Sequence, residues 1–403
     1  MLRWMTAGES HGPALIATIE GLPSGLHVTT DDLRRALARR RLGYGRGARQ
    51  MFEADEVSIL AGVRHGVTTG APVALRIGNS EWPKWETVMS ADPVDPSALL
   101  IDAGTGDERE IARNRPLTRP RPGHADLPGM LSYDLPEARP VLERASARET
   151  AARVALGVLA EALLDQVAGM GLVSHVVSVG GQRATASVLP TPADEAALCE
   201  ASMRAHDPAD NARFEAAVDA AKHAGDTIGG VAEVIAYGVP VGLGTHVSAR
   251  ERLDARLAAA LMSIQSVKGV EIGDGFAQAA LLGSQAHDEI VRGPDDHLTR
   301  TSNHAGGIEG GTSNGSPIIA RAAFKPISTV PRALRSVDLA TGEEAVGLHQ
   351  RSDTCQVVPG AVIAEAEVAL VLADALFEHA GGRSVKEMRR NLEAYLSAVG
   401  ERA

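Results

Sequence analysis

The chain has 403 residues, a formal net charge of −11 at pH 7 and only 3% aromatic residues. This composition argues against a nucleic-acid-binding protein, which needs positive charge to attract phosphates and, for single strands, aromatic side chains on which bases stack. Two cysteines, Cys199 and Cys355, cannot build a disulfide framework or a four-cysteine zinc site, and no apolar run approaches the roughly 20 residues of a membrane span. We therefore expect a cytoplasmic protein with no membrane, nucleic-acid or metal partner.

Hydrophobic patterns predict strands and helices in mixed order. Strands are predicted at Ala14–Glu20, Val57–Gly62, Pro72–Ile77, Val173–Val179, Gly230–Tyr237 and Pro317–Phe324. Helices are predicted at Thr30–Arg41, Ser146–Met170, Asp194–His206, Asp210–His223, Arg252–Ile264 and Ala361–Ala380. The elements do not alternate strictly and no GxGxxG or P-loop motif occurs, so a doubly wound nucleotide-binding sheet is unsupported. Because no linker is recognisable, we expect a single α+β domain over residues 1–403.

The first candidate site residue is His11, in the stretch TAGESHGPAL. The flanking Gly8 and Gly12 predict an open turn, and histidine exchanges protons near neutral pH, so His11 is a candidate proton donor. The alternative is a loop histidine hydrogen-bonded to Glu9, and this stretch alone does not decide between the two.

The first predicted helix ends in an arginine cluster. Thr29 or Thr30 can cap this helix, and Asp31 and Asp32 in its first turn suit its dipole. Seven arginines lie within sixteen positions: Arg34, Arg35, Arg39, Arg40, Arg41, Arg46 and Arg49. In an acidic chain, such a cluster interrupted by glycines indicates a site for anions, because guanidinium binds carboxylate and phosphate bidentately. The alternative is a solvated helix face that runs into a loop.

Residues 79–122, rich in Pro, Asp, Trp and Arg, are predicted to form an extended loop excursion, and long loops in compact enzymes are often functional. The following His124 lies in TRPRPGHADLPG beside Arg119 and Arg121. Neighbouring guanidiniums disfavour a protonated imidazole, whereas a bound anion favours it. His124 is therefore a candidate acid that becomes protonated only in a complex, although the stretch alone fits an ordinary loop histidine equally well.

The next predicted helix opens with RASARETAARVA. Ser146 can cap it and Glu149 can complete a capping box, which is an ordinary helix start. The functional alternative is that the unpaired amides of the first turn, together with Arg144 and Arg148, hold a phosphate or an anionic ring edge.

Three further stretches carry polar groups that suit a ligand. The glycine-rich SNHAGGIEGGTSNGSP can present backbone amides to a flat cofactor or a phosphate. The stretch KPIST places Lys325 and two hydroxyls after a predicted strand, and QRSDTC sets Arg351 two residues before Asp353, so that both can face one ligand. Each of these stretches is a weak indication when taken alone.

Taken together, the stretches resemble one enzyme family. GESHG, RRRLGYGRGAR, RPGHAD, ERASARETA, QSVKGVEIGDGF, NHAGGIEGG, FKPIST and RSDTC occur in this order between residues 8 and 355. The set resembles the chorismate synthases almost from end to end. The resemblance implies a β-α-β sandwich assembled as a homotetramer. It also implies an anti 1,4-elimination of phosphate from 5-enolpyruvylshikimate 3-phosphate to give chorismate, which needs reduced FMN without net redox change and belongs to the shikimate pathway of aromatic amino-acid biosynthesis.

The resemblance also implies roles for single residues. His11 would protonate the departing phosphate, His124 would protonate the reduced flavin, and Asp353 would help to move a proton away from the flavin nitrogen. Arg40, Arg46 and Arg49 would bind the substrate, or NADPH in members that reduce their own flavin. The implied FMN-binding positions are Arg144, Ala145, Ser146, Gln265, Ser266, Gly310, Lys325, Pro326, Ile327, Ser328, Thr329 and Arg351. Ser352 departs from the family pattern, which often has histidine there.

Two other functions compete with this interpretation. A flavin reductase would need a nicotinamide site and has no use for two loop histidines beside so many arginines. A phosphate-ligand or RNA-binding module could use the arginine cluster, but the acidic charge and low aromatic content oppose it. No flavin-reductase domain is recognisable, so we expect reduced FMN to be supplied from elsewhere, with NADPH only as a source of reducing equivalents.

Overall fold

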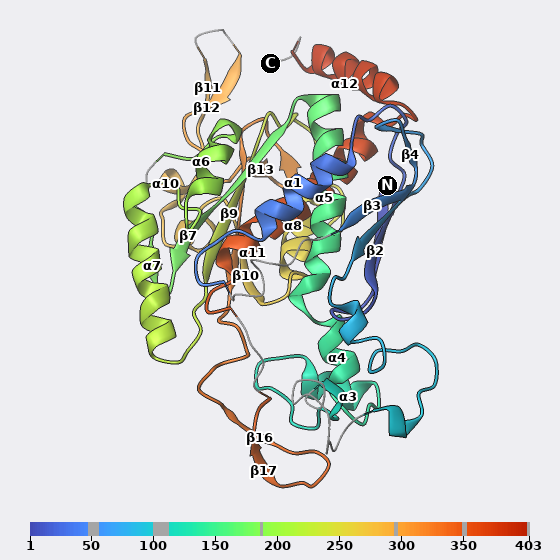
Figure 1. Ribbon diagram of the computed structural model, residues 1–403. Coiled ribbons are helices and arrows are strands. Elements are labelled where there is room, and N and C mark those ends of the chain that lie inside the picture. Colours follow the sequence, from blue (N-terminus) through green and yellow to red (C-terminus); the bar gives the residue numbers. More distant parts are fainter. Residues whose placement is uncertain (47–55, 100–112, 186–187, 294–296, 349–352, 401–403) are drawn as a thin grey trace.

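The computed structural model describes residues 1–46, 56–99, 113–185, 188–293, 297–348 and 353–400. Figure 1 shows two sheets with a layer of helices between them. The first sheet is antiparallel, with the strand order β1 (Arg3–Ala7), β2 (Ala14–Glu20), β6 (Val73–Gly78) and β3 (Val57–Ala61). Along β2, Leu15, Ala17 and Ile19 are buried, so one face of this sheet packs on the helices.

The second sheet is also antiparallel and has five strands. Their order is β10 (Val267–Ile272), β15 (Ile318–Phe324), β9 (Gly230–Tyr237), β7 (Gly171–Val179) and β8 (Gln182–Arg183). The short strands form hairpins: β4 (Val63–Arg64) with β5 (Val67–Thr68), β11 (Ile290–Arg292) with β12 (Leu298–Arg300), β13 (Ile308–Glu309) with β14 (Thr312–Ser313), and β16 (Arg335–Val337) with β17 (Glu344–Val346).

The middle layer consists of α1 (Thr30–Arg40), α5 (Thr150–Ala168), α8 (Leu253–Met262) and α11 (Val357–Ala380). α5 and α11 are apolar around most of their circumference, as expected for helices buried between two sheets. The remaining helices lie further out: α3 (Asp126–Ser132), α4 (Arg139–Arg144), α6 (Glu195–Glu200), α7 (Pro208–His223), α9 (Gly275–Gln278), α10 (Gly283–Ala286) and α12 (Val385–Gly400). One continuous hydrophobic core joins both sheets through the helices, which confirms the expected β-α-β sandwich.

The helices α5 and α11 of the middle layer approach each other closely at Gly157. A Cβ at Gly157 would lie 2.5 Å from the Cβ of Ala366, so any larger side chain must push the two helices apart. We expect Gly157→Leu to lower the free energy of unfolding by about 1–3 kcal/mol, because overpacking a dense core forces backbone shifts. Chemical denaturation measures this loss. The matched control is Gly283→Leu, since a Cβ at Gly283 has no neighbour within 4 Å, and an equal loss in both variants would contradict the argument.

Most predicted elements lie at their expected places, and α1 is capped as its sequence indicates. The Thr29 hydroxyl accepts a hydrogen bond from the amide of Asp32, and the Asp32 carboxylate accepts one from the backbone N–H of Thr29. Two details of the prediction are wrong. The helix predicted over Asp194–His206 ends as α6 at Glu200, because the backbone of Ala201 is extended (ψ 123°). Further on, Arg204 takes a left-handed backbone (φ 53°), and its buried guanidinium donates to Glu195.

The start of the long helix α5 also differs from the prediction. Ser146 caps a turn of 3₁₀ helix at Ala147–Glu149, and α5 itself begins at Thr150. Glu149 does not complete a capping box, because its carboxylate turns away from Ser146 and accepts hydrogen bonds from Thr6 and Gln265. This difference matters for function, since those contacts join three distant segments.

The described part of residues 79–122 is largely irregular, with short 3₁₀ turns at Trp82–Lys84 and Pro96–Ala98. It lies beside α3 and α4 at the lower end of the molecule in Figure 1. None of the helices in the described part of the chain combines the length and hydropathy that crossing a bilayer requires.

Candidate active site

His11 lies in the loop between β1 and β2 and is held by Glu143 in the last turn of α4. The backbone N–H of His11 donates to Oε2 of Glu143 at 2.8 Å, and its ring Nδ1 lies 2.9 and 3.0 Å from the two carboxylate oxygens. The Glu143 side chain is fully buried, and the Ser10 amide donates to the Glu143 carbonyl at 3.0 Å. The ring of His11 therefore contacts the Glu143 carboxylate, in place of the Glu9 contact that the sequence left as an alternative.

The loop excursion covers the flat face of the same imidazole. The rings of His11 and Trp85 stack with their centroids 3.8 Å apart and their planes 23° apart. The guanidinium carbons of Arg113 and Arg139 lie 6.0 and 5.9 Å from the Trp85 ring centroid, within range of a cation–π interaction. Sequence reasoning missed both Trp85 and Glu143. Glu143 was nevertheless part of the motif ERASARETA. Trp85 could have been noticed because the chain has only three tryptophans and this one lies in an arginine-rich loop.

The residues around Ser146 connect the His11 loop to the second sheet. The Ser146 hydroxyl donates to the Ser10 hydroxyl at 3.1 Å, and Arg144 donates to the carbonyl oxygen of Thr6 at 3.0 Å. Ala145 lies between these two side chains in the C-cap of α4. The predicted FMN positions Arg144, Ala145 and Ser146 thus lie directly against the loop that carries His11.

Glu149 makes the central contacts of this connection. It accepts hydrogen bonds from the Thr6 hydroxyl at 2.6 Å, from the Gln265 amide at 3.0 Å and from Arg153 at 2.9 Å. Burial alone would raise the pKa of Glu149, but the Arg153 guanidinium and the two hydrogen bonds outweigh it and lower the pKa. Glu149 is therefore a buried anion that ties Gln265 to the His11 side of the site.

His124 sits in a second polar cluster at the start of α3. Its ring Nδ1 lies 2.5 Å from Oδ1 of Asp126 and 3.1 Å from Nη2 of Arg121. Arg121 also donates to Asp126 at 2.8 Å and to the hydroxyl of Thr329 at 3.1 Å. The expected guanidinium neighbour of His124 is therefore Arg121, whereas Arg119 points away and pairs with Asp338.

Asp126 gives this cluster a pH dependence. Burial would raise its pKa, but hydrogen bonds from His124 and Arg121 and their charges dominate and lower the pKa well below its usual range. A carboxylate with a depressed pKa stabilises the fold above its unfolded pKa of about 4, and this contribution is lost as the pH falls toward the folded value.

We therefore expect Asp126→Asn to be destabilised by about 3–5 kcal/mol at pH 7, because the buried Arg121 loses its counter-charge. The difference in free energy of unfolding between the variant and the wild type should become smaller below about pH 4, where Asp126 of the unfolded wild type takes up a proton. Urea denaturation at a series of pH values measures it. A gap that stays constant down to pH 3 would mean that the carboxylate charge of Asp126 contributes nothing.

The stretch KPIST joins the two histidine clusters. The Lys325 ammonium donates to the carbonyl of Gly123, next to His124, while the Lys325 amide donates to the carbonyl of Ser266 at 3.0 Å. Burial and the nearby Lys268 lower the pKa of Lys325. Gln265 and Ser266, adjacent in sequence, therefore link Glu149 on one side to Lys325 on the other.

The remaining residues of KPIST reach the C-terminal motif. Pro326 and Ser328 flank Ile327, whose carbonyl accepts from the Thr227 hydroxyl at 2.7 Å. Ile228, which follows Thr227 in the chain, donates its amide hydrogen bond to the carbonyl of Thr354 at 3.0 Å. These contacts place Thr354, and with it the adjacent Asp353, near the KPIST segment.

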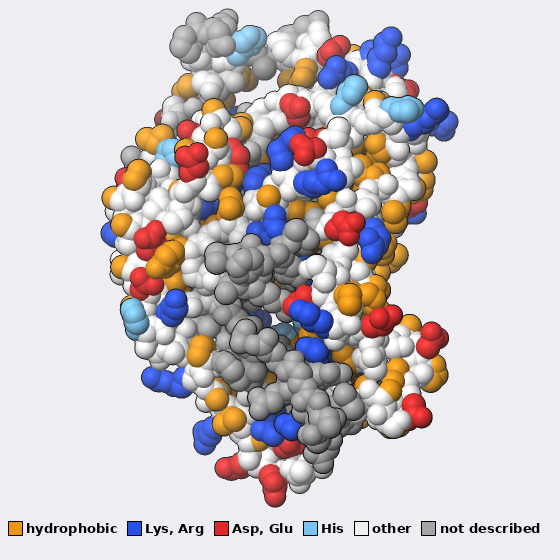
Figure 2. Space-filling view, viewed as in Figure 1, with side chains coloured by type: hydrophobic (Ala, Val, Ile, Leu, Met, Phe, Trp, Pro, Cys, Tyr) orange, Lys and Arg blue, Asp and Glu red, His pale blue; other side chains and the backbone are white. Residues whose placement is uncertain are grey.

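Asp353 forms an ion pair with one arginine of the cluster. Nη1 of Arg46 lies 2.8 Å from Oδ2 of Asp353, and their side chains are only 9% and 13% exposed. The Thr354 amide donates to the carbonyl of Gly45, a position that needs glycine because its φ is 79° and a Cβ would lie 2.8 Å from Val218. In Figure 2, several basic side chains are visible around the centre of this face.

The rest of the arginine cluster divides by position. Arg40 is buried and donates to the Thr150 hydroxyl at 3.0 Å and to the Ala147 carbonyl at 2.8 Å, at the start of α5. Arg34 is exposed, and Arg35 pairs with acidic residues of its own helix. Arg39 is half-buried and pairs with Glu195 and with the buried Glu365. Arg40 and Arg46 therefore form the inner side of the cluster, and its exposed members form a solvated helix face.

Gly310 lies outside this contact network. It lies in the turn of the β13–β14 hairpin, whose Gly311 accepts from Leu253 at the start of α8, whereas Gln265 follows the other end of that helix. Arg49 and Arg351 lie outside the described residues. The roles expected for all three stay predictions.

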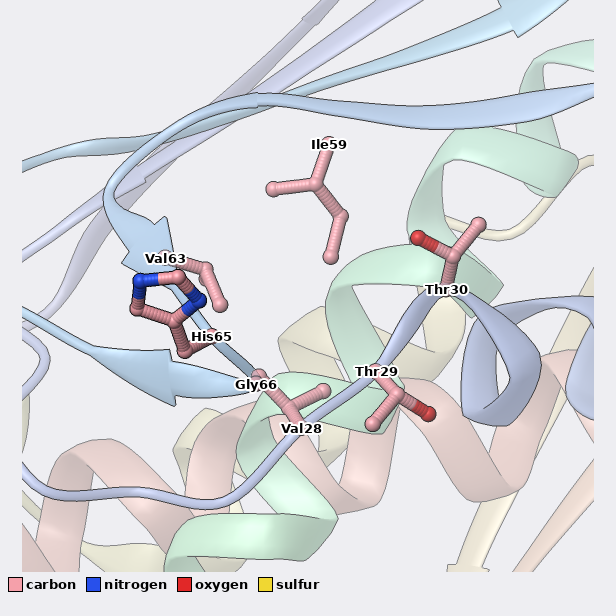
Figure 3. A pocket seen from close by; sticks show the side chains of 7 residues that line it. All are labelled: Val28, Thr29, Thr30, Ile59, Val63, His65 and Gly66. Carbon is pink, nitrogen blue, oxygen red and sulfur yellow. The ribbon is translucent and has the colours of Figure 1, made fainter.

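One hollow on the described surface lies elsewhere. It measures about 300 Å³ and is formed by the start of α1, β3 and the β4–β5 hairpin (Figure 3). Its lining residues are Val28, Thr29, Thr30, Ile59, Val63, His65 and Gly66. With no arginine, lysine or carboxylate in the lining, this hollow does not suit a multiply charged anion.

The network residues fit a flavin phosphate such as FMN. The side-chain oxygen Oε1 of Gln265 is buried and has no hydrogen-bond partner within the described chain, so it can accept a bond from a ligand N–H. Arg144 lies 4.0 Å from Glu149, which binds the Gln265 amide, and the backbone of Lys325 bonds to the adjacent Ser266. Donors, an acceptor and cations from separate segments are therefore joined in one network, which suits an anionic, hydrogen-bonding ring system.

A β-α-β sandwich that holds two histidines against buried carboxylates beside a set of arginines defines an enzyme acting on anionic substrates. The family model described as chorismate synthase matches residues 2–377. The curated chorismate synthase of Beutenbergia cavernae is 61% identical over 402 residues, covering 100% of this chain and 99% of the relative. That of Mycobacteroides abscessus is 58% identical over 402 residues, covering 100% and 95%.

A solved structure described as the crystal structure of chorismate synthase superposes with a TM-score of 0.76 at 35% identity, covering 99% of this chain and 98% of the other. The chain therefore belongs to the chorismate synthase family. It is a carbon–oxygen lyase of aromatic amino-acid biosynthesis that acts on a small-molecule substrate.

Proposed function

We propose that this chain eliminates phosphate from 5-enolpyruvylshikimate 3-phosphate to give chorismate at the contact network that runs from His11 to His124. The observation that carries the proposal is this network, because it joins segments separated by more than 300 residues around two histidines and several cations. A substrate with two carboxylates and a phosphate needs such a concentration of cations, and the acidic chain offers it only locally.

Reduced FMN belongs to the same proposal. When bound, it supplies electron density to the substrate as phosphate departs, without net redox change. Arg144, Ser146, Gln265 and Lys325 hold it, and the arginines at 46 and 49 bind the substrate, while NADPH enters only as a source of reducing equivalents.

Three side chains handle protons in this proposal, each at a different place. His11, held through Nδ1 by Glu143, uses Nε2 to protonate the departing phosphate. His124 keeps the charge state of the cofactor site, since a bound anion compensates for the nearby Arg121. Asp353, paired with Arg46, relays the proton that leaves the ring of the substrate.

We also propose a cytoplasmic homotetramer of single-domain subunits. Its support is the apolar surface that one subunit leaves uncovered: Phe276 is 79%, Leu282 71% and Ile290 62% exposed, all on α9, the turn before α10 and the β11–β12 hairpin. These three residues lie within fifteen positions of the sequence, and contiguous exposed apolar patches mark association surfaces.

The test of this function is anaerobic incubation of the protein with reduced FMN and 5-enolpyruvylshikimate 3-phosphate. We expect equal amounts of phosphate and chorismate to form, and none with oxidised FMN. Steady oxidation of NADPH by added flavin without any shikimate-type substrate would instead support a flavin reductase. Absence of chorismate under strictly reducing conditions would overturn the proposal.

A further inference from the structure

Glu143 approaches His11 in a way that controls which ring nitrogen can exchange a proton. Both carboxylate oxygens lie within 3.0 Å of Nδ1, and the same carboxylate accepts the backbone N–H of His11 at 2.8 Å. A carboxylate only accepts hydrogen bonds, so Nδ1 must be the donor and carry a proton. Proton exchange with a ligand is therefore left to Nε2.

The environment of Glu143 keeps the carboxylate in place. Its side chain is fully buried, and the guanidinium of Arg139 lies 3.9 Å away on the same helix. Arg139 is itself anchored, since it donates to the carbonyl oxygens of Arg113 at 2.6 Å and Arg115 at 3.2 Å. The excursion that carries these carbonyls also carries Trp85, which stacks on His11. Glu143 therefore holds the Nδ1 edge of the imidazole and Trp85 covers its plane, and Arg139 links α4 to the excursion that carries Trp85.

His124 provides an internal contrast. Its Nδ1 faces both the Asp126 carboxylate at 2.5 Å and a guanidinium nitrogen of Arg121 at 3.1 Å, so an acceptor and a donor compete for one nitrogen. At Nδ1 of His11, by contrast, both oxygens of the Glu143 carboxylate lie within 3.0 Å, and both are acceptors. The tautomer of His11 is therefore fixed by its surroundings, whereas that of His124 can respond to a bound anion.

We propose that Glu143 is a positioning residue of the elimination. It accepts the Nδ1–H of doubly protonated His11, so that the second proton, on Nε2, passes to the departing phosphate and leaves neutral Nδ1–H imidazole. This inference rests on the proposed role of His11. Carboxylates that orient a functional histidine through its second ring nitrogen typically contribute 10–100-fold to activity in metal sites, and the same physical reason applies to proton transfer.

The experiment is a double-mutant cycle of Glu143→Gln and His11→Ala in the reduced-FMN assay. We expect Glu143→Gln to lower kcat about 10–100-fold with KM for the substrate changed less than about threefold. In the His11→Ala background, Glu143→Gln should cause no further loss, because both changes remove the same interaction. The matched control is Glu233→Gln, which removes another buried carboxylate bonded to a histidine, His175, at 2.7 Å in the second sheet; its kcat should stay within twofold.

A second readout does not depend on turnover. Nitrogen-15 spectra of histidine-labelled protein distinguish Nδ1–H from Nε2–H in neutral imidazole, the form that remains after proton transfer. At a pH high enough to reach this neutral form, we expect the His11 signal to show Nδ1–H in the wild type and a mixture in Glu143→Gln. If Glu143→Gln does not fold, Glu143→Asp keeps the charge, and it should retain the Nδ1–H form with a smaller loss of kcat.

Three outcomes would overturn the inference. Glu143→Gln could keep kcat within twofold while His11→Ala loses activity, which would leave the proposed function intact. It could lower kcat equally in the presence and absence of His11, which would mean that Glu143 acts on another group. Wild-type turnover in His11→Ala would remove the role of His11 and this inference together.

Discussion

His11→Ala and His124→Ala should each lower kcat by about 10²–10⁴-fold, the usual contribution of a positioned acid. The physical reason is that each imidazole is held at Nδ1 by a buried carboxylate, so that removing the ring removes an oriented proton carrier and not merely a contact. Single-turnover absorbance of the flavin and release of phosphate under anaerobic conditions measure the loss. The far-ultraviolet circular dichroism should remain unchanged.

The control for both variants is His223→Ala, an exposed histidine at the end of α7. It should keep full turnover. Near wild-type turnover in His11→Ala or His124→Ala, at saturating substrate and reduced flavin, would remove that residue from the mechanism. Because His11 also stacks on Trp85, His11→Asn offers a variant that fills more of the space and should be equally inactive.

The second large effect is expected at the Arg46–Asp353 ion pair. Asp353→Asn keeps the size of the side chain but removes its basic charge, so binding of oxidised FMN and substrate should persist while turnover falls at least about tenfold. Arg46→Ala should weaken substrate binding by about 1.5–3 kcal/mol, the range for a hydrogen bond to a charged group. It should also lower the free energy of unfolding by on the order of 3 kcal/mol, because it breaks a largely buried ion pair.

Fluorescence titration of FMN, substrate binding by calorimetry and single-turnover kinetics separate these effects. Arg34→Ala is the matched control, since this arginine belongs to the same cluster but is exposed. If Asp353→Asn turns over normally, Asp353 is only the structural partner of Arg46. Equal substrate affinity in Arg46→Ala and Arg34→Ala would mean that the arginine cluster has no role in substrate binding.

Local sequence patterns predicted the elements that bury one regular face. The alternation in β2 and the apolar run of α11 are examples, since the first hides every second residue and the second hides nearly all of them. The edge strand β1 was missed because its residues Arg3 to Ala7 are mostly exposed and lack a buried alternation. The helix α12 was missed although Val385, Met388 and Leu392 follow a helical spacing and are buried.

The site was predictable as a set of residues but not as a geometry. The family motifs indicated His11 and Asp353, yet the partners that define their chemistry, Glu143 and Arg46, are separated from them by 132 and 307 positions in sequence. Such pairings depend on tertiary packing. Arg40 shows the same point, because its guanidinium is bonded to the first turn of α5, and a role in substrate binding stays a prediction.

The middle layer of the sandwich has a consequence for how the chain reaches its native state. α5 ends at Ala168 and its main partner α11 begins at Val357, so about 190 residues must be synthesised between them, which takes on the order of 10–40 s at 5–20 residues per second. Until then, the second sheet lacks the helix that packs on β7 and β9. The nascent chain therefore exposes the apolar strands of this sheet while it is being synthesised, and its yield in the cell should depend on chaperones more strongly than its final stability suggests.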